Sequence, residues 1–300
     1  MADNAAARLE DRSARAARLL EILELERIEE NLYRGRNEAR GNFRLFGGQV
    51  LAQALRAAYA TVEERQAHSV HGYFMRAGNA GLPVLYEVDR IRDGRSFTTR
   101  RVVAIQEGKA IFSMSVSFQV EEAGFEHSAS MPNVPPPDEL EDDMLVVARL
   151  EAAHPNLSPM AGRPRPFETR SVFPLGSEAW EQNRFWNPVW IRFAGPDDGD
   201  EALRRCLLAY ASDMGLVSTS MLPHGDTLRR DAVQMASLDH ALWIHRPIAT
   251  DQWLLFHKHT STATGARGLV HAAFYAADGE LLASVTQEGL VREHRDAEAR

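Results

Sequence analysis

Residues 111–119 alternate between apolar and polar side chains. The apolar members are Phe112, Met114, Val116 and Phe118, with serines between them. A period of two places these four on one face of a β-strand, because successive strand side chains point to opposite sides. A Glu-Gly pair at residues 107–108 supplies a two-residue hairpin turn, so residues 100–105 are predicted to pair with residues 111–119. A matching Asp-Gly turn predicts that residues 268–276 pair with residues 281–289.

The order of motifs around the first hairpin recurs around the second. His71-Gly-Tyr-Phe-Met-Arg76 stands ten residues before Tyr86, and Ala241-Leu-Trp-Ile-His-Arg246 stands ten residues before Phe256. Corresponding positions remain about 170 residues apart throughout, and several motifs that share order and spacing are a repeat signal. The sequence therefore predicts two copies of one α+β unit.

Each copy also contains a segment with helical periodicity. In the first copy, Gly47-Gly48 precedes the apolar positions Val50, Leu51, Ala54, Leu55 and Ala58. In the second copy, the apolar positions are Leu203, Cys206, Leu207 and Tyr210. Both sets approximate an i, i+4 stripe, which is typical of a helix with one buried face. We expect a small antiparallel sheet wrapped around one long helix, twice over.

A segment rich in proline and acidic residues separates the two copies. It contains three consecutive prolines at 135–137 and an acidic run at 138–143, which disfavour a sheet interior and favour solvent. We therefore divide the chain into a helical leader (1–20) expected to be frayed, a first unit (21–120), a linker with room for one helix (121–166) and a second unit (167–300).

Composition excludes several classes of protein. A hydrophobic content of 44% argues against general disorder, and a net charge of −8 disfavours a nucleic-acid footprint. The single cysteine, Cys206, cannot form an internal disulfide and fits a reducing compartment. No apolar run approaches the roughly 18 residues of a membrane span. The leader carries acids and lacks an apolar core, and the last four residues match no targeting address, so the cytoplasm is expected.

Asp213 is a polar residue at a position where the helical period calls for an apolar one. It follows Tyr210 by three residues and Cys206 by seven, on the apolar stripe of the second helix. Burial there would raise the pKa of the carboxyl group and make it a better base. The alternative is that the helix ends earlier and Asp213 merely caps it or faces solvent.

Gln287 and Ser237 are the other polar candidates. Gln287 follows Leu281, Ala283 and Val285 in phase on one strand face, and Val116 is its counterpart in the first copy. A buried amide must find partners, so it could hold a water molecule, although a strand-end residue turning to solvent fits equally. Ser237 is predicted to open a strand that runs to residue 244, and its hydroxyl alone indicates little.

Metal and nucleotide chemistry have little support. His240 and His245 are five residues apart and His257 and His259 are two apart, and neither spacing matches a zinc pattern. The chain has no Gly-x-Ser-x-Gly elbow, no phosphate-binding loop and no dinucleotide fingerprint. We therefore expect no metal and no cofactor.

Several longer motifs, taken in order, resemble those of one family. They are Phe46-Gly-Gly-Gln-Val50, Arg92-Asp-Gly-Arg-Ser-Phe97, Ala123-Gly-Phe-Glu-His127, Tyr210-Ala-Ser-Asp213, Ala236-Ser-Leu-Asp-His240, Trp243-Ile-His-Arg-Pro247 and Gln287-Glu-Gly289. On these motifs the chain resembles the type II acyl-CoA thioesterases, over roughly residues 23–294. The resemblance implies an α+β double-hotdog fold and hydrolysis of acyl-CoA to a free fatty acid and coenzyme A. It also implies assembly into a homodimer or homotetramer.

The resemblance assigns roles to the three polar candidates. Members of the family activate water with an Asp, a Thr or Ser, and a Gln, which fall here on Asp213, Ser237 and Gln287. Thr is common where this chain has Ser237, and serine keeps the hydroxyl but lacks the methyl group that restricts the side chain. Val116 and the absence of an Asp in the first helix predict one active site per chain.

Substrate contacts are expected from four further residues. Backbone N–H groups of Gly47 and Gly48, at a helix start, are candidates for stabilising the thioester oxygen. His68, with His71, lies near the first strand of the unit as a candidate site neighbour or a structural histidine. Arg95 belongs to a set of arginines suited either to coenzyme A phosphates or to a solvated strand edge. That set is Arg90, Arg92, Arg95, Arg100 and Arg101.

Two other functions remain open. A hotdog hydratase acting on enoyl-CoA would need an Asp and a His close together, and Asp239-His240 is the tempting pair. As strand neighbours these two point to opposite faces, which counts against the hydratase. The other alternative is a protein that binds or senses acyl-CoA without hydrolysing it.

Overall fold

The computed structural model describes residues 2–37, 44–153, 165–197, 200–224 and 233–293. Its helices are α1 (Ala2–Leu23), α2 (Gly47–Tyr59), α3 (Asp143–Ala153), α4 (Glu178–Gln182), α5 (Glu201–Ser212) and α6 (Leu216–Thr219), with 3-10 turns η1 (Pro137–Glu139) and η2 (Leu222–His224). The first-half strands are β1 (Glu26–Glu29), β2 (Leu32–Gly35), β3 (Gln66–Phe74), β4 (Val84–Asp93), β5 (Phe97–Gln106) and β6 (Lys109–Gln119). The second-half strands are β7 (Phe167–Ser171), β8 (Trp186–Phe193), β9 (Val233–Ser237), β10 (Asp239–Ile244), β11 (Leu254–Thr264), β12 (Arg267–Ala276) and β13 (Leu281–Glu293).

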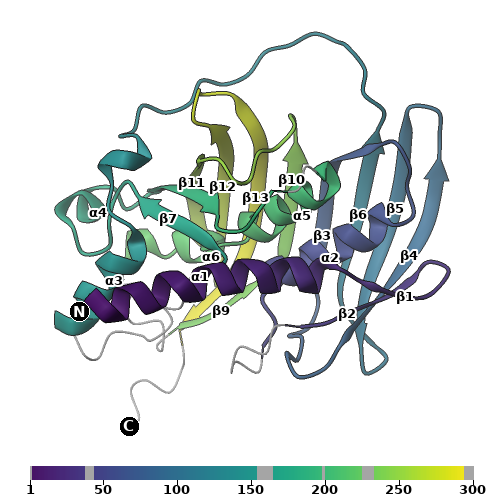
Figure 1. The fold of residues 1–300 in the computed structure, drawn as a ribbon, viewed down its shortest axis with the longest axis horizontal. Coiled ribbons are helices and arrows are strands. Elements are labelled where there is room, and N and C mark those ends of the chain that lie inside the picture. The colour runs from purple at the N-terminus through teal and green to yellow at the C-terminus, as the bar shows by residue number, and fades with distance from the viewer. Residues whose placement is uncertain (1, 38–43, 154–164, 198–199, 225–232, 294–300) are drawn as a thin grey trace.

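All these strands belong to one antiparallel sheet that is built from two copies of the same strand order. The first copy runs β2-β4-β5-β6-β3, and the second runs β8-β11-β12-β13-β10. The copies join where β3 pairs antiparallel with β10, with His71 opposite Ala241. The sheet curves around α2 and α5 (Figure 1). The predicted α+β double hotdog is therefore confirmed.

Both predicted hairpins are present. β5 pairs with β6 and β12 pairs with β13. At the first turn Glu107 has φ 49° and Gly108 has φ 70°, the left-handed pair that a tight two-residue turn requires. The four apolar residues of β6 are all buried, while the serines between them are half-buried or exposed, as the alternation predicts.

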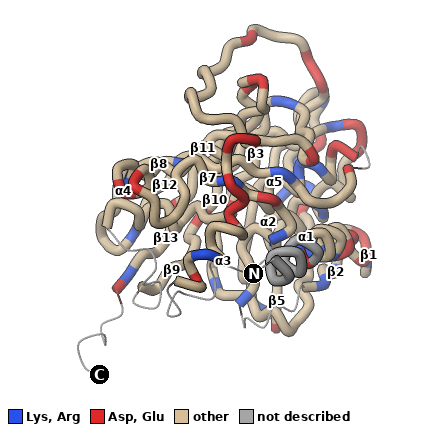
Figure 2. Tube along the Cα trace, turned by 60° about the vertical axis from the view of Figure 1, so that its left-hand side comes forward, with Lys and Arg blue, Asp and Glu red and all other residues tan. Residues whose placement is uncertain are grey.

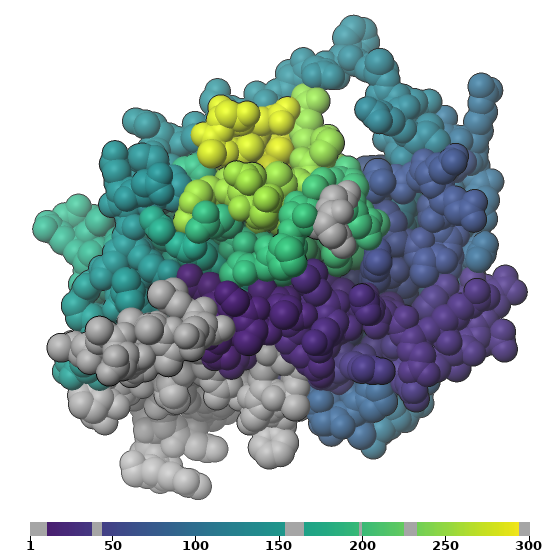
Figure 3. Space-filling view, in the orientation of Figure 1, coloured from purple at the N-terminus to yellow at the C-terminus, as the bar shows by residue number. Residues whose placement is uncertain are grey.

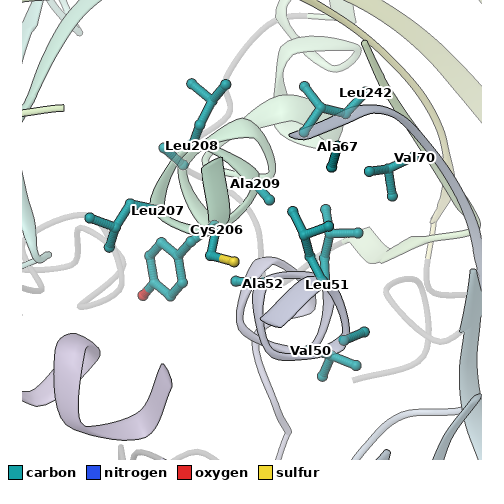
Figure 4. Close-up of a cluster of buried hydrophobic side chains, with 14 of the residues drawn as sticks. Val50, Leu51, Ala52, Ala67, Val70, Cys206, Leu207, Leu208, Ala209 and Leu242 are labelled. Atoms are coloured by element: carbon teal, nitrogen blue, oxygen red, sulfur yellow. The ribbon is translucent and has the colours of Figure 1, made fainter. Parts of the chain in front are cut away.

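The two central helices lie antiparallel and in contact. Near one end, Arg56 of α2 bonds to Asp200, the N-cap of α5, at 3.1 Å. At the other end, a side chain at Gly48 would meet the Tyr210 carbonyl at 2.5 Å, so only glycine allows this approach. Figure 4 shows the apolar faces between them, with Ala52 of α2 beside Cys206 of α5. Each helix therefore begins where the other ends.

The leader helix is integrated into the fold. α1 continues to Leu23 and contributes Ala16, Leu19, Ile22 and Leu23 to the core. Arg12 makes two 2.8 Å bonds to the carboxylate of Asp142, which anchors α1 to the segment that precedes α3. The expectation of a frayed leader is wrong for residues 12–23, because their apolar face is buried.

The linker contains η1 and α3, and residues 121–130, which precede them, are exposed. This stretch arches over the sheet in Figure 1 and stands away from the body in Figure 3. Figure 2 shows acidic residues along the linker. Residues 154–164 of the predicted linker lie outside the described residues, as do residues 294–300, on which part of the localisation prediction rested. No helix in the described part of the chain is long and apolar enough to cross a membrane.

Candidate functional site

Asp213 lies at the junction of the two repeats. α5 ends at Ser212, so Asp213 is the C-cap residue and does not belong to the helical stripe. It is nevertheless only 8% exposed, so the idea that it faces solvent is also wrong. Its Oδ2 accepts the backbone N–H of Gly48, the second residue of α2, at 2.7 Å. The carboxylate thus satisfies one of the N–H groups that a helix start leaves unpaired.

The environment of Asp213 favours a base that titrates near neutrality. Burial raises the pKa of Asp213 to about 6, while hydrogen bonds from Gln287, Gly48 and Ser237 oppose the rise. The positive end of the α2 dipole also favours the ionised form. Desolvation outweighs these contacts, so the carboxylate is ionised at neutral pH yet basic enough to accept a proton.

Gln287 lies in β13 with its side chain fully buried, as its phase with Ala283 and Val285 predicts. Its Nε2 donates to Asp213 Oδ1 at 2.7 Å. Its Oε1 is buried and has no hydrogen-bond partner within the described residues. An unpaired buried acceptor is costly, so this oxygen is available to a donor that enters the site.

Ser237 is the most loosely held member of the group. Ser237 is the last residue of β9 and does not open a strand that continues to residue 244. The regular strand is interrupted at Leu238, and β10 begins at the next residue. The backbone of Leu238 bridges two strands, since its N–H donates to Glu288 and its carbonyl accepts from Phe74. The Ser237 hydroxyl lies 3.5 Å from Asp213 Oδ1, longer than the 2.5–3.0 Å usual for such bonds.

Gly47 and Gly48 lie against Asp213, as the start of α2 requires. A side chain at Gly47 would meet Asp213 Oδ2 at 2.8 Å. The Gly48 N–H, which the sequence suggested for the thioester oxygen, is already bonded to Asp213. Its observed partner is therefore the Asp213 carboxylate.

His240 is a member of this cluster that the sequence did not identify. Its Nδ1 lies 3.1 Å from Gln287 Nε2, and its Nε2 lies 2.8 Å from the Ser212 hydroxyl. Burial lowers the pKa of His240 to about 3, so the imidazole is neutral. The signal was present in the sequence, because His240 is in phase with Leu242 and Ile244, which are both buried.

Asp239 does not take part in this cluster. Its carboxylate accepts the backbone N–H of Glu288 at 2.7 Å and thereby closes the break between β9 and β10. Asp239 is half-buried while His240 is 1% exposed, so the two point to opposite faces as expected. They do not form an acid–base pair.

The structure does not bring His68 or Arg95 to Asp213. His68 bonds to the Ser117 hydroxyl at 2.8 Å, in register with serines that point away from the core. Arg95 lies in the exposed β4–β5 turn, and its carbonyl accepts from Arg65 beyond the end of α2. Gly48 is at the start of that helix, so the two ends are about 18 Å apart at 1.5 Å per residue.

Arg100 is neither a phosphate ligand nor part of a solvated edge. Its side chain is 1% exposed and bonds to Thr61 Oγ1 at 2.9 Å and to Asp93 Oδ1 at 2.6 Å. It joins the end of α2 to the β4–β5 hairpin.

Among the histidines considered for a metal, His257 and His259 both stack on Trp186. The described residues contain no group of three metal-ligating side chains.

The comparisons with known proteins agree on one family. Family models described as the N-terminal and C-terminal domains of acyl-CoA thioesterases match residues 36–119 and 135–291. Acyl-CoA thioesterase 2 of Haemophilus influenzae is 35% identical over 279 residues, covering 91% of this chain and 96% of its own. Acyl-coenzyme A thioesterase 8 of Homo sapiens is 39% identical over 281 residues, covering 90% of this chain and 88% of its own.

Solved structures give the same result. An acyl-CoA thioesterase II from Mycobacterium marinum superimposes with a TM-score of 0.75 at 39% identity, covering 92% of this chain and 99% of its own. A tesB protein from Mycobacterium avium subs paratuberculosis superimposes with a TM-score of 0.78 at 28% identity, covering 93% of this chain and 99% of its own.

Proposed function

The chain belongs to the acyl-CoA thioesterase family, and on this premise we propose that it hydrolyses acyl-CoA thioesters to a free fatty acid and coenzyme A. One observation carries the proposal: a buried carboxylate with a pKa of about 6 touches a buried amide whose oxygen lacks a partner. That arrangement suits a water molecule that must be held and deprotonated.

Asp213 is the proposed general base. A water molecule donates one hydrogen bond to the Asp213 carboxylate and the other to Gln287 Oε1, the unpaired acceptor, while Ser237 holds it from a third side. The water oxygen attacks the thioester carbonyl carbon as Asp213 takes its proton. Collapse of the tetrahedral intermediate breaks the carbon–sulfur bond, and the thiolate of coenzyme A recovers the proton from Asp213.

The oxygen of the intermediate needs donors of its own. The Gly48 N–H serves Asp213, so we assign the role to the neighbouring N–H of Gly47, the first residue of α2. The first N–H groups of a helix have no intrahelical partner and point toward developing negative charge. Gly47 therefore takes over the role that the sequence suggested for both glycines.

One active site per chain remains our prediction. Pairing places Val70 beside Val116 in the first repeat, at the positions that correspond to His240 and Gln287 in the second. Both valines are at most 1% exposed and belong to the apolar core. The first repeat thus offers packing where the second offers polar groups.

Neither His68 nor Arg95 contacts Asp213, and Arg95 lies beyond the far end of α2, so we place any role of Arg95 in binding at the distant end of coenzyme A. Arg95→Ala would then raise KM and leave kcat unchanged.

We also propose that the enzyme is cytoplasmic and that it assembles into a homodimer or homotetramer. Cell fractionation would test its location, and light scattering would test its assembly.

Release of free thiol from a panel of acyl-CoAs tests the function. A hydrolase releases thiol, an enoyl-CoA hydratase consumes its substrate without releasing thiol, and a sensor does neither. Asp213→Asn and Gln287→Ala are expected to abolish or strongly reduce release. Unchanged rates in both variants would refute the mechanism, and no release at any chain length would refute the enzyme.

A further inference from the structure

His240 and Ser212 form a chain of hydrogen bonds that ends on Gln287. The Ser212 hydroxyl donates to the Ala209 carbonyl at 2.8 Å, one helical turn earlier. The same hydroxyl lies 2.8 Å from His240 Nε2, and His240 Nδ1 lies 3.1 Å from Gln287 Nε2. Ser212 and Gln287 are fully buried and His240 is 1% exposed, so water cannot substitute for these partners.

The directions of these bonds follow from Asp213, because a carboxylate only accepts. The NH₂ group of Gln287 must then face Asp213 and, with its second hydrogen, His240 Nδ1, so the Ser212 oxygen accepts from His240 Nε2 while its own proton goes to the Ala209 carbonyl. His240 therefore carries its proton on Nε2, which leaves Nδ1 bare as an acceptor. A bare Nδ1 requires that the Gln287 NH₂ group, not its oxygen, face the imidazole.

The NH₂ group of Gln287 thus donates to two acceptors at once. One amide hydrogen goes to Asp213 and the other to His240. Rotating the amide by half a turn would set Oε1 against both Asp213 and Nδ1, which lack donors for it. Oε1 is consequently fixed on the side of the amide that does not face Asp213 Oδ1 and His240 Nδ1, where it is buried and unpaired.

Comparison of the repeats shows that His240 belongs with the site. Val70 and Val116 lie opposite each other in the first repeat, where His240 and Gln287 lie in the second. The fold therefore tolerates two apolar residues at this pair of positions, so the imidazole is not needed to build the sheet.

We propose that His240, held in one tautomer by Ser212, is a positioning residue that locks the Gln287 amide with its oxygen toward the hydrolytic water. The proposal rests on the proposed thioesterase function for its kinetic consequence. Its structural content, the tautomer and the amide orientation, can be measured without substrate.

Loss of the hydrogen bond between His240 and Gln287 would change the pKa of Asp213. A free amide can flip when Asp213 is protonated and accept the carboxyl proton on Oε1, which stabilises the protonated form. The pKa of Asp213 then rises, and the acidic limb of the activity profile moves to higher pH. The groups that bond to Asp213 are Gly48 of α2, Ser237 of β9 and Gln287 of β13. His240 of β10 contacts Gln287, and Lys258 of β11 lies beside Gly215 without acting on Asp213 directly.

Heteronuclear NMR of isotope-labelled histidine is the first test. His240 should appear as the neutral Nε2–H tautomer across the range from about pH 5 to about pH 8, where an ordinary histidine titrates. Ser212→Ala removes the partner of His240 Nε2, so the Nδ1–H tautomer should become populated as well. An Nδ1–H tautomer or an imidazolium in the wild-type chain would overturn the proposal, whether or not the chain hydrolyses acyl-CoA.

Kinetics of two His240 variants is the second test. His240→Asn places an amide oxygen near the position of Nδ1 and should retain kcat within a few-fold. His240→Leu removes the acceptor and should lower kcat by about 10- to 100-fold, the cost of misplacing a reacting group. Its acidic limb should move to higher pH, which simple loss of stability would not cause.

Val70→Ala is the matched control, since it disturbs the equivalent core position of the first repeat. It should lower stability and leave kcat and the pH profile unchanged. Equal kcat and pH profiles in His240→Leu and the wild type would overturn the positioning role. If the wild type releases no thiol at all, the proposed function fails and the NMR result alone decides the inference.

Discussion

The backbone N–H of Gly48 donates to the carboxylate of Asp213 at 2.7 Å, between residues 165 positions apart in the chain. The start of one repeat's helix thus holds the carboxylate at the end of the other's. The contact fixes one carboxylate oxygen and leaves the second to Gln287 and Ser237. The properties of Asp213 are therefore set by both repeats.

Activity should depend on the ionisation of Asp213. A general base works only when deprotonated, so kcat/KM is expected to rise with pH and level off above the pKa of about 6. Initial rates measured from about pH 4.5 to about pH 8 on a stable substrate would show the midpoint. A midpoint near the ordinary aspartate value would mean that Asp213 is not desolvated in solution.

Asp213→Asn should destroy activity and remove the pH dependence of stability that the buried carboxylate causes. The folded-state pKa of about 6 lies above the ordinary 3.8, so the wild type loses stability as pH rises between these values and stays less stable above them. The Asn variant lacks this pH-dependent loss of up to about 3 kcal/mol, although its amide offers one acceptor oxygen where the carboxylate offers two to Gln287 and Gly48. Activity should fall by about 10²- to 10⁴-fold.

Urea unfolding of both proteins at the two pH extremes measures this difference. A stability of the Asn variant that falls with pH as steeply as that of the wild type would contradict the cost assigned to the buried charge.

Gln287 and Val116 form a matched pair for the claim of one site. Gln287→Met should lower kcat by about 100-fold and also lower stability, because it leaves the Asp213 carboxylate and His240 Nδ1 without the donor that Gln287 Nε2 provides. Val116→Ala should cost about 2 kcal/mol of stability through the lost methyl groups and leave kcat unchanged. A loss of kcat in the folded Val116 variant would indicate a second site.

Gly48→Ala should damage both packing and chemistry. The new methyl group would lie 2.5 Å from the Tyr210 carbonyl, so α2 must move away from α5 and from Asp213. We expect lower stability and a large fall in kcat. Gly124→Ala in the exposed linker meets nothing within 4 Å and serves as the control, with both quantities near wild type.

Ser237 should tolerate one substitution and not the other. Ser237→Thr keeps the hydroxyl and is expected to retain kcat within a few-fold, while Ser237→Ala should lose about tenfold, the value of one weak hydrogen bond. Steady-state kinetics of both variants decides this. Equal rates in the Ala variant would remove Ser237 from the mechanism.

Local periodicity predicted most of the fold. The alternation around Val116 predicted the strand and its buried face, and the same phase offered Gln287 either a buried position or a solvent-facing strand end, of which the structure has the buried one. The joining of the repeats through β3 and β10 has no comparable sequence signal, because strand pairing between distant segments leaves no period in either.

The errors at the site have a common physical cause. The stripe that continues to Tyr210 leaves open whether Asp213 belongs to the helix or caps it, and in the structure α5 ends at Ser212, where the start of α2 docks. The break at Leu238 similarly depends on backbone bonds to two other strands. His240 was judged by its spacing to other polar residues, although its phase with Leu242 already marked it as buried. Tertiary contacts fix these features, and a single segment does not encode them.

The meeting of β3 and β10 has a consequence for what one chain can do that two identical chains cannot. In a symmetric dimer of single repeats, every strand pair of one repeat would recur in the other, so polar residues buried at one pair would be buried at both. Here the valines of the β3–β6 pair and the histidine and glutamine on β10 and β13 are encoded separately. One half can therefore keep an apolar core while the other carries the buried polar groups, and the chain specialises its halves without changing its architecture.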